Sequence, residues 1–309
     1  MDKGGPAGAQ SRHFRHDDVH PPGPAPRFAS APTMALRWCA RSERGRRPDN
    51  EDSYLVGRVH RAFDALGTNV PDSALPRRLE QDGWLLGVAD GLGGASAGEV
   101  ASALALSAGV RFVLSEVRWN FRLGEADLGG LRERAERVFR SIDTEISARA
   151  SESADLFGMG TTLTAAYVIE RLLLLLHVGD SRAYLMRGGR LRRLTHDHTV
   201  AQSLADQGAI RQDEVEGHRL RHVLERAMGR DQRELEIEVV VEPLEHGDRL
   251  LFSTDGLTEA LGDDEIAAIL GAHATEERAC LELVDRALAR GTSDNVTVVV
   301  ATCAAPGAA

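Results

Sequence analysis

The segment Gly83–Glu99, GWLLGVADGLGGASAGE, places a carboxylate at the end of an apolar run and follows it with glycine at four of the next eight positions. The residues before Asp90 predict a buried strand over Gly83–Asp90, because a short apolar run bounded by glycine is typical of one. An ionised carboxylate in such a place is costly unless another group compensates its charge. The sequence therefore predicts that Asp90 faces a compensating partner.

The glycines after Asp90 approach two nucleotide-binding patterns without matching either. A dinucleotide fingerprint requires G-x-G-x-x-G, but counting from Gly91 the third glycine is replaced by Ser96. A P-loop requires a lysine, and this segment contains none. The glycines fit instead a tight turn into a helix that begins near Ala97. Nucleotide binding is not expected here.

Other acidic residues stand at the ends of further predicted strands. They are Glu51 and Asp52 before a strand, Asp180 and Asp255 after strands, and Asp294 before the last strand. Each short motif alone is typical of a turn in which the aspartate caps its own backbone. Strand ends are rigid, however, so these carboxylates can converge on one point, where a divalent cation would relieve their repulsion. Ligation by oxygen alone suits Mg²⁺ or Mn²⁺, and the glycines after Asp90 and Asp255 would let a main-chain carbonyl join the site.

Composition indicates a soluble protein. The 309 residues are 42% hydrophobic and 27% charged, and the net charge of -10 argues against a nucleic-acid partner. The three cysteines, Cys39, Cys280 and Cys303, form no CxxC pair, which suits a reducing compartment. The apolar run Leu172–Leu176 is far shorter than a membrane span, and no signal-peptide pattern opens the chain. We expect a monomeric cytoplasmic protein without a membrane partner.

The chain divides into tails and one packed domain. Residues 1–33 are rich in Gly, Pro, Ala and Arg and have no apolar period, which is typical of a disordered tail. Residues 34–304 have the composition of a folded domain, and residues 305–309 form a second short tail. Within the domain we expect an inserted loop over residues 60–81 and a variable polar segment over residues 208–222.

Predicted strands come in runs that are separated by helices. Helices are expected over Ala97–Val117, Leu128–Ala150, Thr199–Gln207, Asp264–Leu270 and Thr275–Arg290. Strands are expected at Asp52–Val59, at Gly83–Asp90, in the closely spaced run from Thr161 to Thr195, and in ELEIEVVVE, DRLLFSTDG and NVTVVVATC. This order predicts an α+β fold, with two stacked antiparallel sheets covered by helices, rather than a doubly wound parallel sheet.

Two further motifs have simpler explanations than catalysis. His196 and His198 flank Asp197 in THDHT, but the segment precedes a predicted helix, so capping is favoured over metal binding. A serine hydrolase is not expected, because no G-x-S-x-G elbow is present.

Taken in order, seven segments resemble the metal-dependent protein phosphatases (type 2C, the PPM class), especially the bacterial members. They are RRPDNEDSYLV, GVADGLGGASAGEVAS, GMGTTLTAAYV, LHVGDSRAYLMRGGRLRRLTHDHT, LERAMG, GDRLLFSTDGLTEAL and GTSDNVTVVV, and they cover about Ala35 to Thr302. The resemblance implies a four-layer αββα sandwich with a binuclear Mn²⁺/Mg²⁺ centre at one end. It implies a phosphatase that hydrolyses phosphoserine and phosphothreonine of proteins, the substrates of a serine/threonine kinase, by attack of a hydroxide that bridges the two ions.

The resemblance also implies a role for individual residues. Asp90 would bridge the two ions and Gly91 would lend its carbonyl, while Asp255 and Asp294 would hold the other ion. Asp180 would help to hold a third, weaker ion. Glu51 and Asp52 would orient metal-bound water, and Arg47 would bind the substrate phosphate. Residues 208–222 would form the flap beside the cleft.

The sequence departs from the family at two places near the site. Leu92 stands where eukaryotic relatives have a histidine proposed as general acid, and where bacterial relatives usually have methionine, so the source of the leaving-group proton is unassigned. The segment before Asn50 is one residue short, which sets Arg46 beside Arg47 as a candidate for the phosphate-binding arginine. Two other functions stay open: a catalytically weak relative that binds phosphoproteins as a regulator, and a phosphatase of a small phosphorylated metabolite.

Overall fold

Most strands of the protein belong to two large antiparallel sheets. The computed structural model describes residues 34–71, 77–93, 96–115, 125–229 and 235–305. Within these ranges, one five-stranded sheet has the order β1 (Ala35–Glu43), β12 (Val296–Ala304), β11 (Arg249–Ser253), β8 (Arg182–Arg187) and β9 (Arg190–Arg193). The other has the order β10 (Glu238–Pro243), β7 (Leu172–Val178), β6 (Leu163–Ile169), β3 (Arg78–Ala89) and β2 (Ser53–Asp64). A small sheet pairs β4 (Gly91–Leu92) with β5 (Gly160–Thr161).

Buried apolar side chains on both faces of a single strand explain why the two large sheets stack. In β7, Leu173 and Leu175 belong to the core between the sheets, whereas Leu174 and Leu176 belong to the core on the opposite face. Because successive side chains of a strand point to opposite faces, an unbroken apolar run predicts a strand that is covered on both sides. The run Leu172–Leu176 meets this expectation, since its last four leucines are buried.

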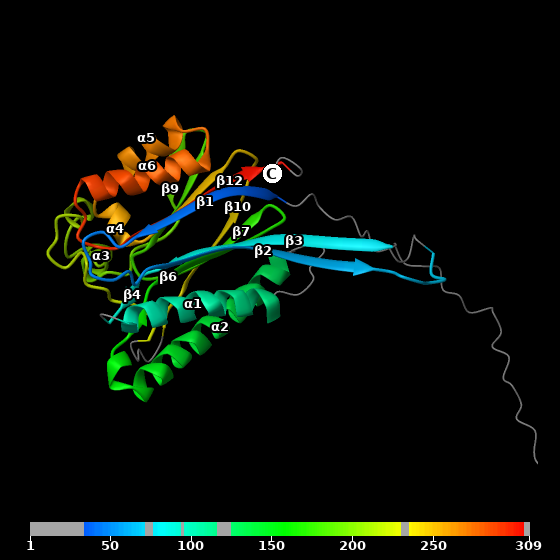
Figure 1. Ribbon diagram of the computed structural model, residues 1–309, viewed down its shortest axis with the longest axis horizontal. Coiled ribbons are helices and arrows are strands. Elements are labelled where there is room, and N and C mark those ends of the chain that lie inside the picture. The colour runs from blue at the N-terminus through cyan, green and yellow to red at the C-terminus, as the bar shows by residue number, and fades with distance from the viewer. Residues whose placement is uncertain (1–33, 72–76, 94–95, 116–124, 230–234, 306–309) are drawn as a thin grey trace, which may run out of the picture.

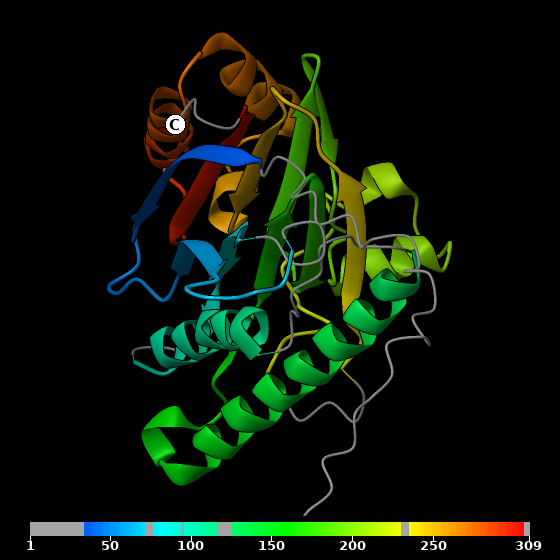
Figure 2. The same cartoon turned by 90° about the vertical axis from the view of Figure 1, so that its right-hand side faces the viewer.

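Helices cover the two outer faces and complete a four-layer sandwich (Figures 1 and 2). One face of the β2–β3–β6–β7–β10 sheet carries α1 (Ser96–Ser115) and α2 (Glu125–Glu152), which contribute Ala101, Ala105, Phe139 and Ile142 to their core. The other sheet carries α4 (Asp255–Thr258), α5 (Asp263–Ala272) and α6 (Glu276–Ala289). The remaining short helices are α3 (Val200–Asp206) and the 3₁₀ turns Ala154–Leu156 and Gln212–Glu214. The predicted α+β sandwich is therefore confirmed.

Helix α1 is the most apolar helix of the described chain. By length and composition alone, Ala97–Ser115 could cross a membrane, but about half of that window is buried inside the protein. Ala97, Ala101 and Ala105 are fully buried against the sheet. The apolar composition of α1 is therefore the composition of a core helix.

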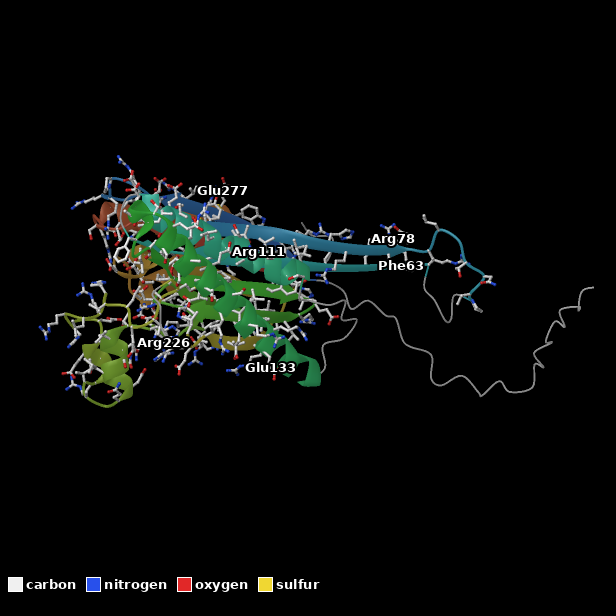
Figure 3. All side chains as sticks on the ribbon, turned by 90° about the horizontal axis from the view of Figure 1, so that it is seen from below. Phe63, Arg78, Arg111, Glu133, Arg226 and Glu277 are labelled. Atoms are coloured by element: carbon white, nitrogen blue, oxygen red, sulfur yellow. The ribbon has the colours of Figure 1, made fainter. Side chains whose placement is uncertain are left out.

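An inserted loop was expected over residues 60–81, but residues 60–64 and 78–81 at its two ends are strand, so the expected bounds of the loop were too wide. β2 and β3 pair continuously from Ser53–Ala89 to Asp64–Arg78, so the two strands form a hairpin that extends beyond the body (Figure 1). Phe63 and Arg78 are labelled on this extension in Figure 3, well away from the helices. Because both faces of the extension are exposed, its strands need no apolar stripe, and their polar sequence gave no strand signal.

The other predicted elements are confirmed with small shifts of their ends, where they lie in the described ranges. The elements that were not predicted include β1 and the short helix α4, which begins directly at Asp255. The tail predicted over residues 1–33, and residues 306–309 of the C-terminal tail, lie outside the described residues.

Candidate metal centre

The acidic residues at the strand ends meet at one end of the sandwich. They line a cavity of about 530 Å³, together with Arg47, Gly91 and Leu92. Its lining acids are Asp49, Glu51, Asp90, Asp180, Asp255, Glu259 and Asp294. Asp52 is buried behind them, with 8% of its surface exposed. Of the acids expected to converge, all but Asp52 therefore line one cavity.

Asn295 holds the loop that carries Arg47 and Glu51. Its side-chain nitrogen donates to the carbonyls of Arg44 and Asp49, both at 2.9 Å, and its side-chain oxygen accepts from Glu51 N at 2.8 Å. This single buried amide, at the start of β12, fixes a loop that comes from the opposite end of the sequence.

Two glycines allow Glu51 to approach Asp90. A Cβ at Gly91 would collide with the backbone of Gly98 and with the carbonyl of Glu51. A Cβ at Gly98 would collide with the Glu51 carboxylate itself. Glycine is needed at both positions, because the loop before β2, strand β4 and the first turn of α1 all meet at this point.

The backbone of Asp90 is fixed on both sides. Asp90 N donates to Thr162 Oγ1 at 2.9 Å, and the Asp90 carbonyl accepts from Thr162 N at 2.9 Å and from Thr161 Oγ1 at 2.8 Å. The main chain is thus satisfied within the protein, and the side chain of Asp90 lines the cavity.

Several carboxylate oxygens of the cluster are buried without a hydrogen-bond partner. Among the described residues these include Glu51 Oε1, Asp52 Oδ1 and Asp255 Oδ1. The other oxygen of Asp52, Oδ2, accepts from Thr254 Oγ1 at 2.7 Å, and Thr254 Oγ1 in turn accepts from Thr297 N at 3.0 Å. Buried polar atoms without partners are rare in proteins, so a group of them at one end of the sandwich is typical of a site that binds a cation.

Burial and mutual repulsion raise the pKa values of the clustered acids. Burial is the largest cause, and neighbouring carboxylates add to it. The pKa of Asp90 and of Asp255 is raised well above the usual value, and the pKa of Asp52 and of Asp180 rises to about 7. The protein alone therefore does not supply enough positive charge to keep these groups ionised.

Arg47 is the cation nearest to the cluster. Its Nη2 donates to Asp294 Oδ2 at 2.6 Å, and this hydrogen bond is the largest cause of the raised pKa of Arg47. Arg46 instead lies against Gly291 and does not line the cavity. Between the two arginines that the sequence left as candidates, the structure thus places Arg47 at the acids.

The flap segment contributes residues that the sequence did not single out. Residues 208–222 follow α3, and Arg221 and His222 line the acidic cavity. His222 Nδ1 lies 2.5 Å from Oε1 of Glu259, which directly follows α4. The sequence gives no sign of this pairing, because no motif or periodicity connects the flap with α4 and only the fold brings them together.

The segment THDHT has a structural role. Thr199 caps α3, since its Oγ1 accepts from Gln202 N at 3.3 Å. Asp197 forms an ion pair with Arg182 at 2.6 Å, and His198 is buried and accepts from Gly179 N at 3.1 Å. Capping by this segment is confirmed.

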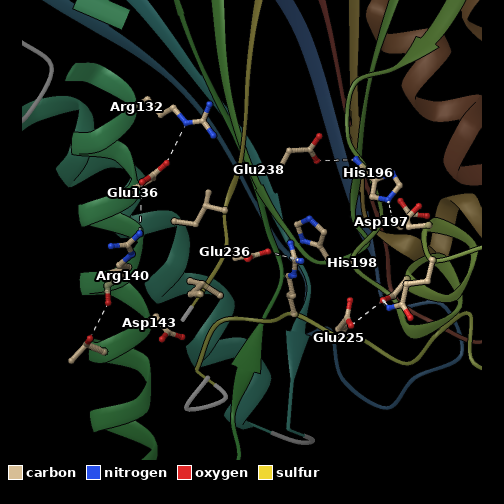
Figure 4. Close-up of a pocket in the computed structure, with 17 residues that line it drawn as sticks. Arg132, Glu136, Arg140, Asp143, His196, Asp197, His198, Glu225, Glu236 and Glu238 are labelled. Atoms are coloured by element: carbon tan, nitrogen blue, oxygen red, sulfur yellow. Dashed lines mark hydrogen bonds and ion pairs between the residues drawn. The ribbon is translucent and has the colours of Figure 1, made fainter. Parts of the chain in front are cut away.

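A larger cavity, of about 1250 Å³, lies between α2, β10 and residues 196–207 (Figure 4). Its charged side chains pair with one another: Glu136 with Arg132, Glu236 with Arg226, and Asp206 with His196. Charges that compensate one another do not require a ligand. The smaller cavity, with its unpartnered carboxylates, is therefore the candidate site.

The residues of the smaller cavity fit hard divalent cations. Every clustered side chain offers oxygen, and unpartnered oxygens are already present without any rearrangement. Carboxylate and carbonyl oxygens, with water completing the shell, are the ligands preferred by Mg²⁺ and Mn²⁺.

Comparison with known proteins agrees with this reading of the site. The family model described as "Protein phosphatase 2C" matches residues 67–290, a range that includes Asp90, Asp180 and Asp255. The serine/threonine protein phosphatase PstP of Mycobacterium tuberculosis is 36% identical over 271 residues, which are 87% of this chain and 45% of PstP. The serine/threonine phosphatase stp of Listeria monocytogenes is 32% identical over 213 residues, covering 69% of this chain and 82% of that protein. The chain thus spans about half the length of PstP and most of stp.

Solved structures show the same fold. The catalytic domain of PstP in complex with two manganese ions has a TM-score of 0.68 and 33% identity, covering 88% of this chain and all of that one. The phosphatase Stp1 of Staphylococcus aureus has a TM-score of 0.70 and 28% identity, covering 87% of this chain and 96% of that one. The family model and the relatives together place this chain in the protein phosphatase 2C family.

Proposed function

We propose that this chain is a metal-dependent protein serine/threonine phosphatase that works with two Mn²⁺ or Mg²⁺ ions. The observation that carries the proposal is the group of buried, unpartnered carboxylate oxygens at and behind one cavity, next to the guanidinium of Arg47. The named activities of PstP and stp, and the two manganese ions in the PstP catalytic domain, support it.

The residues that would hold the ions are those whose backbones are already fixed. Asp90 would serve both ions, and the Gly91 carbonyl would join it. Asp255 and Asp294, which line the cavity from the other sheet, would hold the second ion. Asp180 would contribute to a third, weaker site. Asp52 lies behind the cavity and is bound to Thr254, so it would act with Glu51 on water rather than on substrate.

When bound, two such ions lower the pKa of water and neutralise charge on the phosphoryl oxygens. The chain itself would then supply orientation and further charge. Arg47 would bind the phosphoryl oxygens, a task for which its fork of N–H donors suits it better than a lysine. Glu51 and Asp52 would accept hydrogen bonds from water and fix its direction of approach. No cysteine lines the cavity, and the proposal requires no phosphoenzyme.

The named activities of two relatives bear on the substrate class. We infer phosphoproteins, the substrates of a serine/threonine kinase, because PstP and stp are named as serine/threonine phosphatases. A phosphatase of a small phosphorylated metabolite would use the same site. A regulator that only binds phosphoproteins is disfavoured, because no acid of the site is missing. We extend the proposal to a monomer in the cytoplasm, a location that suits its three free cysteines.

An assay with several phosphate esters tests this proposal. Purified protein would be incubated with phosphothreonine peptides, phosphorylated metabolites and p-nitrophenyl phosphate, with Mn²⁺ or with a chelator. We expect Mn²⁺-dependent phosphate release from the peptides, and little release by the Asp90→Asn and Asp255→Asn variants. Hydrolysis of metabolites but not of peptides would replace the proposed substrate class. No hydrolysis of any ester would leave the regulator as the better account.

A further inference from the structure

We propose that His222 donates the proton to the leaving oxygen of the substrate, and that Glu259 positions it. This inference rests on the proposed phosphatase function and names a catalytic residue that the family resemblance leaves unassigned. The expulsion of a serine or threonine alkoxide is slow unless a proton reaches it, because an alkoxide is a strongly basic leaving group.

Leu92 cannot supply that proton. It lines the cavity at the end of the glycine turn, at the position where eukaryotic relatives have a histidine. Its side chain has no exchangeable hydrogen. The donor must therefore come from another wall of the cavity or from solvent.

His222 is the only imidazole among the described residues that line the cavity. The acids on the same walls are taken up as proposed metal ligands or lie beside them. Arg47 and Arg221 hold their protons too tightly to donate them. Histidine is the side chain that most readily gives and takes a proton near neutral pH.

The contact with Glu259 orients the ring. His222 Nδ1 lies 2.5 Å from Glu259 Oε1, and their side chains are 39% and 25% exposed. A carboxylate on Nδ1 holds the ring in one direction. Among the described residues, no hydrogen-bond partner is found for Nε2, which leaves that nitrogen available for a substrate.

His222 is also close to the proposed centre of the reaction. One atom each of His222, Asp255 and Glu259 lie within 4.8 Å of one another. The flap thus brings its imidazole to the wall of the cavity beside Asp255. A donor held there can reach a phosphoester that is bound in the same cavity.

The proposed step balances without a further reactant. Oxygen from water forms the new bond to phosphorus. The bond from phosphorus to the substrate Oγ breaks, and its electron pair stays on Oγ. The proton of His222 Nε2 moves to Oγ, giving the free hydroxyl. The imidazole regains a proton from solvent, to which the attacking water has lost one.

The same residues could instead ligate a metal ion, and the experiment separates these roles. The His222→Gln variant would be compared with the parent on phosphothreonine peptide and on a series of aryl phosphates ending in p-nitrophenyl phosphate, at saturating Mn²⁺. Proton donation is worth roughly 10²–10⁴-fold in rate. We expect a loss of about 100-fold or more in kcat for the peptide, and of less than about 5-fold for p-nitrophenyl phosphate, whose leaving group needs little protonation. Across the aryl phosphates, the kcat of His222→Gln should also fall more steeply with leaving-group basicity than the kcat of the parent.

Controls make the result specific. His218→Gln changes another histidine of the same flap, which does not line the cavity, and should alter neither substrate. Glu259→Gln should reproduce the His222→Gln pattern in weaker form. Mn²⁺ binding by His222→Gln, measured by calorimetry, should match the parent. An equal loss on all esters, or the loss of a bound ion, would overturn the inference while leaving the phosphatase function intact. A parent inactive on every ester would overturn both.

Discussion

Arg47 Nη2 donates a hydrogen bond to Asp294 Oδ2 at 2.6 Å, so the proposed phosphate-binding arginine is held by a proposed metal ligand. The Arg47 side chain is 53% exposed and the Asp294 side chain is 23% exposed. An ion pair this exposed is worth about 1 kcal/mol or less, so it can be exchanged readily. If Asp294 held a cation as proposed, Arg47 would lose this partner and become available to phosphate.

Replacing Arg47 should separate substrate binding from metal binding. In Arg47→Gln, the affinity for Mn²⁺ should stay equal or rise by a few-fold, because an exposed competing cation has been removed. The kcat/KM for phosphopeptide should fall by roughly 10²-fold, because a charge-assisted hydrogen-bond pair to phosphate is lost. Calorimetry and steady-state kinetics measure the two effects. Arg46→Gln is the matched control and should change neither.

The acid cluster should make the metal-free protein sensitive to pH. The pKa of Asp52 and of Asp180 is raised to about 7, and burial and the neighbouring charges raise that of Asp90 and of Asp255 well above the usual value. The folded state therefore binds more protons than the unfolded state between about pH 4 and pH 7, and its stability falls as the pH rises through that range. Above about pH 7, the destabilisation that Asp52 and Asp180 contribute is complete.

The Asp90→Asn variant isolates this effect. In the presence of chelator at pH 8, its melting temperature should exceed that of the parent by several degrees, since each pKa unit corresponds to about 1.4 kcal/mol. At pH 5 the difference should shrink. Mn²⁺ should raise the melting temperature of the parent more at pH 8 than at pH 5. A parent that is the more stable protein in chelator at pH 8 would contradict this account.

Thr254 should be needed for stability as well as for the site. Its hydroxyl donates to Asp52 and accepts from Thr297 N, and all of these groups are buried. Thr254→Val keeps the shape but leaves two polar groups without partners, at a cost of about 1–3 kcal/mol each. Chemical denaturation should show that the free energy of unfolding falls by about 1–3 kcal/mol for each of the two groups. Thr144→Val, at an exposed helix position, is the control and should change stability by less than about 0.5 kcal/mol.

Two buried histidines should make the protein sensitive to acid. Burial is the main cause that lowers the pKa of His177 to about 4 and of His198 to about 3. Because the folded state binds fewer protons than the unfolded state, their contribution to stability is complete above about pH 6.5 and is lost as the pH falls. At pH 5, each ring accounts for a loss of about 2 kcal/mol.

Denaturation of a histidine variant at two pH values checks this contribution. His198→Asn retains an acceptor for Gly179 N and cannot gain the proton, so its stability should fall less than that of the parent between pH 7.5 and pH 5. His246→Asn, at an exposed turn, should follow the parent. An equal fall in stability between pH 7.5 and pH 5 for the parent and for His198→Asn would refute the assignment of this acid sensitivity to His198.

The extension of the β2–β3 hairpin should be dispensable for folding. Ala62 pairs with Glu80, so residues 63–79 can be replaced by Asn-Gly, a two-residue turn that suits the twist of a hairpin. The extension carries exposed residues such as Phe63 and Leu66, which contribute little buried area. The shortened protein should melt within about 3 °C of the parent and should keep its activity on p-nitrophenyl phosphate. A large loss of either would show that the extension supports the domain.

The sequence predicted the layers and the acids of the site well, because both depend on short-range patterns. An apolar run such as Leu172–Leu176 indicates a strand covered on both faces, and the acids at strand ends indicate a common edge. The position of Asp90 and of Asp255 therefore followed from their own strands.

What the sequence could not reveal depends on contacts between distant segments. The pairing of His222 with Glu259 and the binding of Asp52 by Thr254 join segments that no periodicity connects. The hairpin extension was missed for a different reason: exposed paired strands carry no apolar signal. The choice between Arg46 and Arg47 also required the structure, because neighbouring arginines differ only in the direction of their side chains.

Calorimetric titration of Mn²⁺ into chelator-stripped protein tests the central claim most directly, because the claim concerns the purpose of the buried carboxylates. We predict that the parent binds at least two ions at neutral pH, that Asp255→Asn loses one of them, and that Asp90→Asn, which lacks the shared ligand, loses both. Absence of binding by the parent, or unchanged binding by Asp90→Asn, would contradict the account.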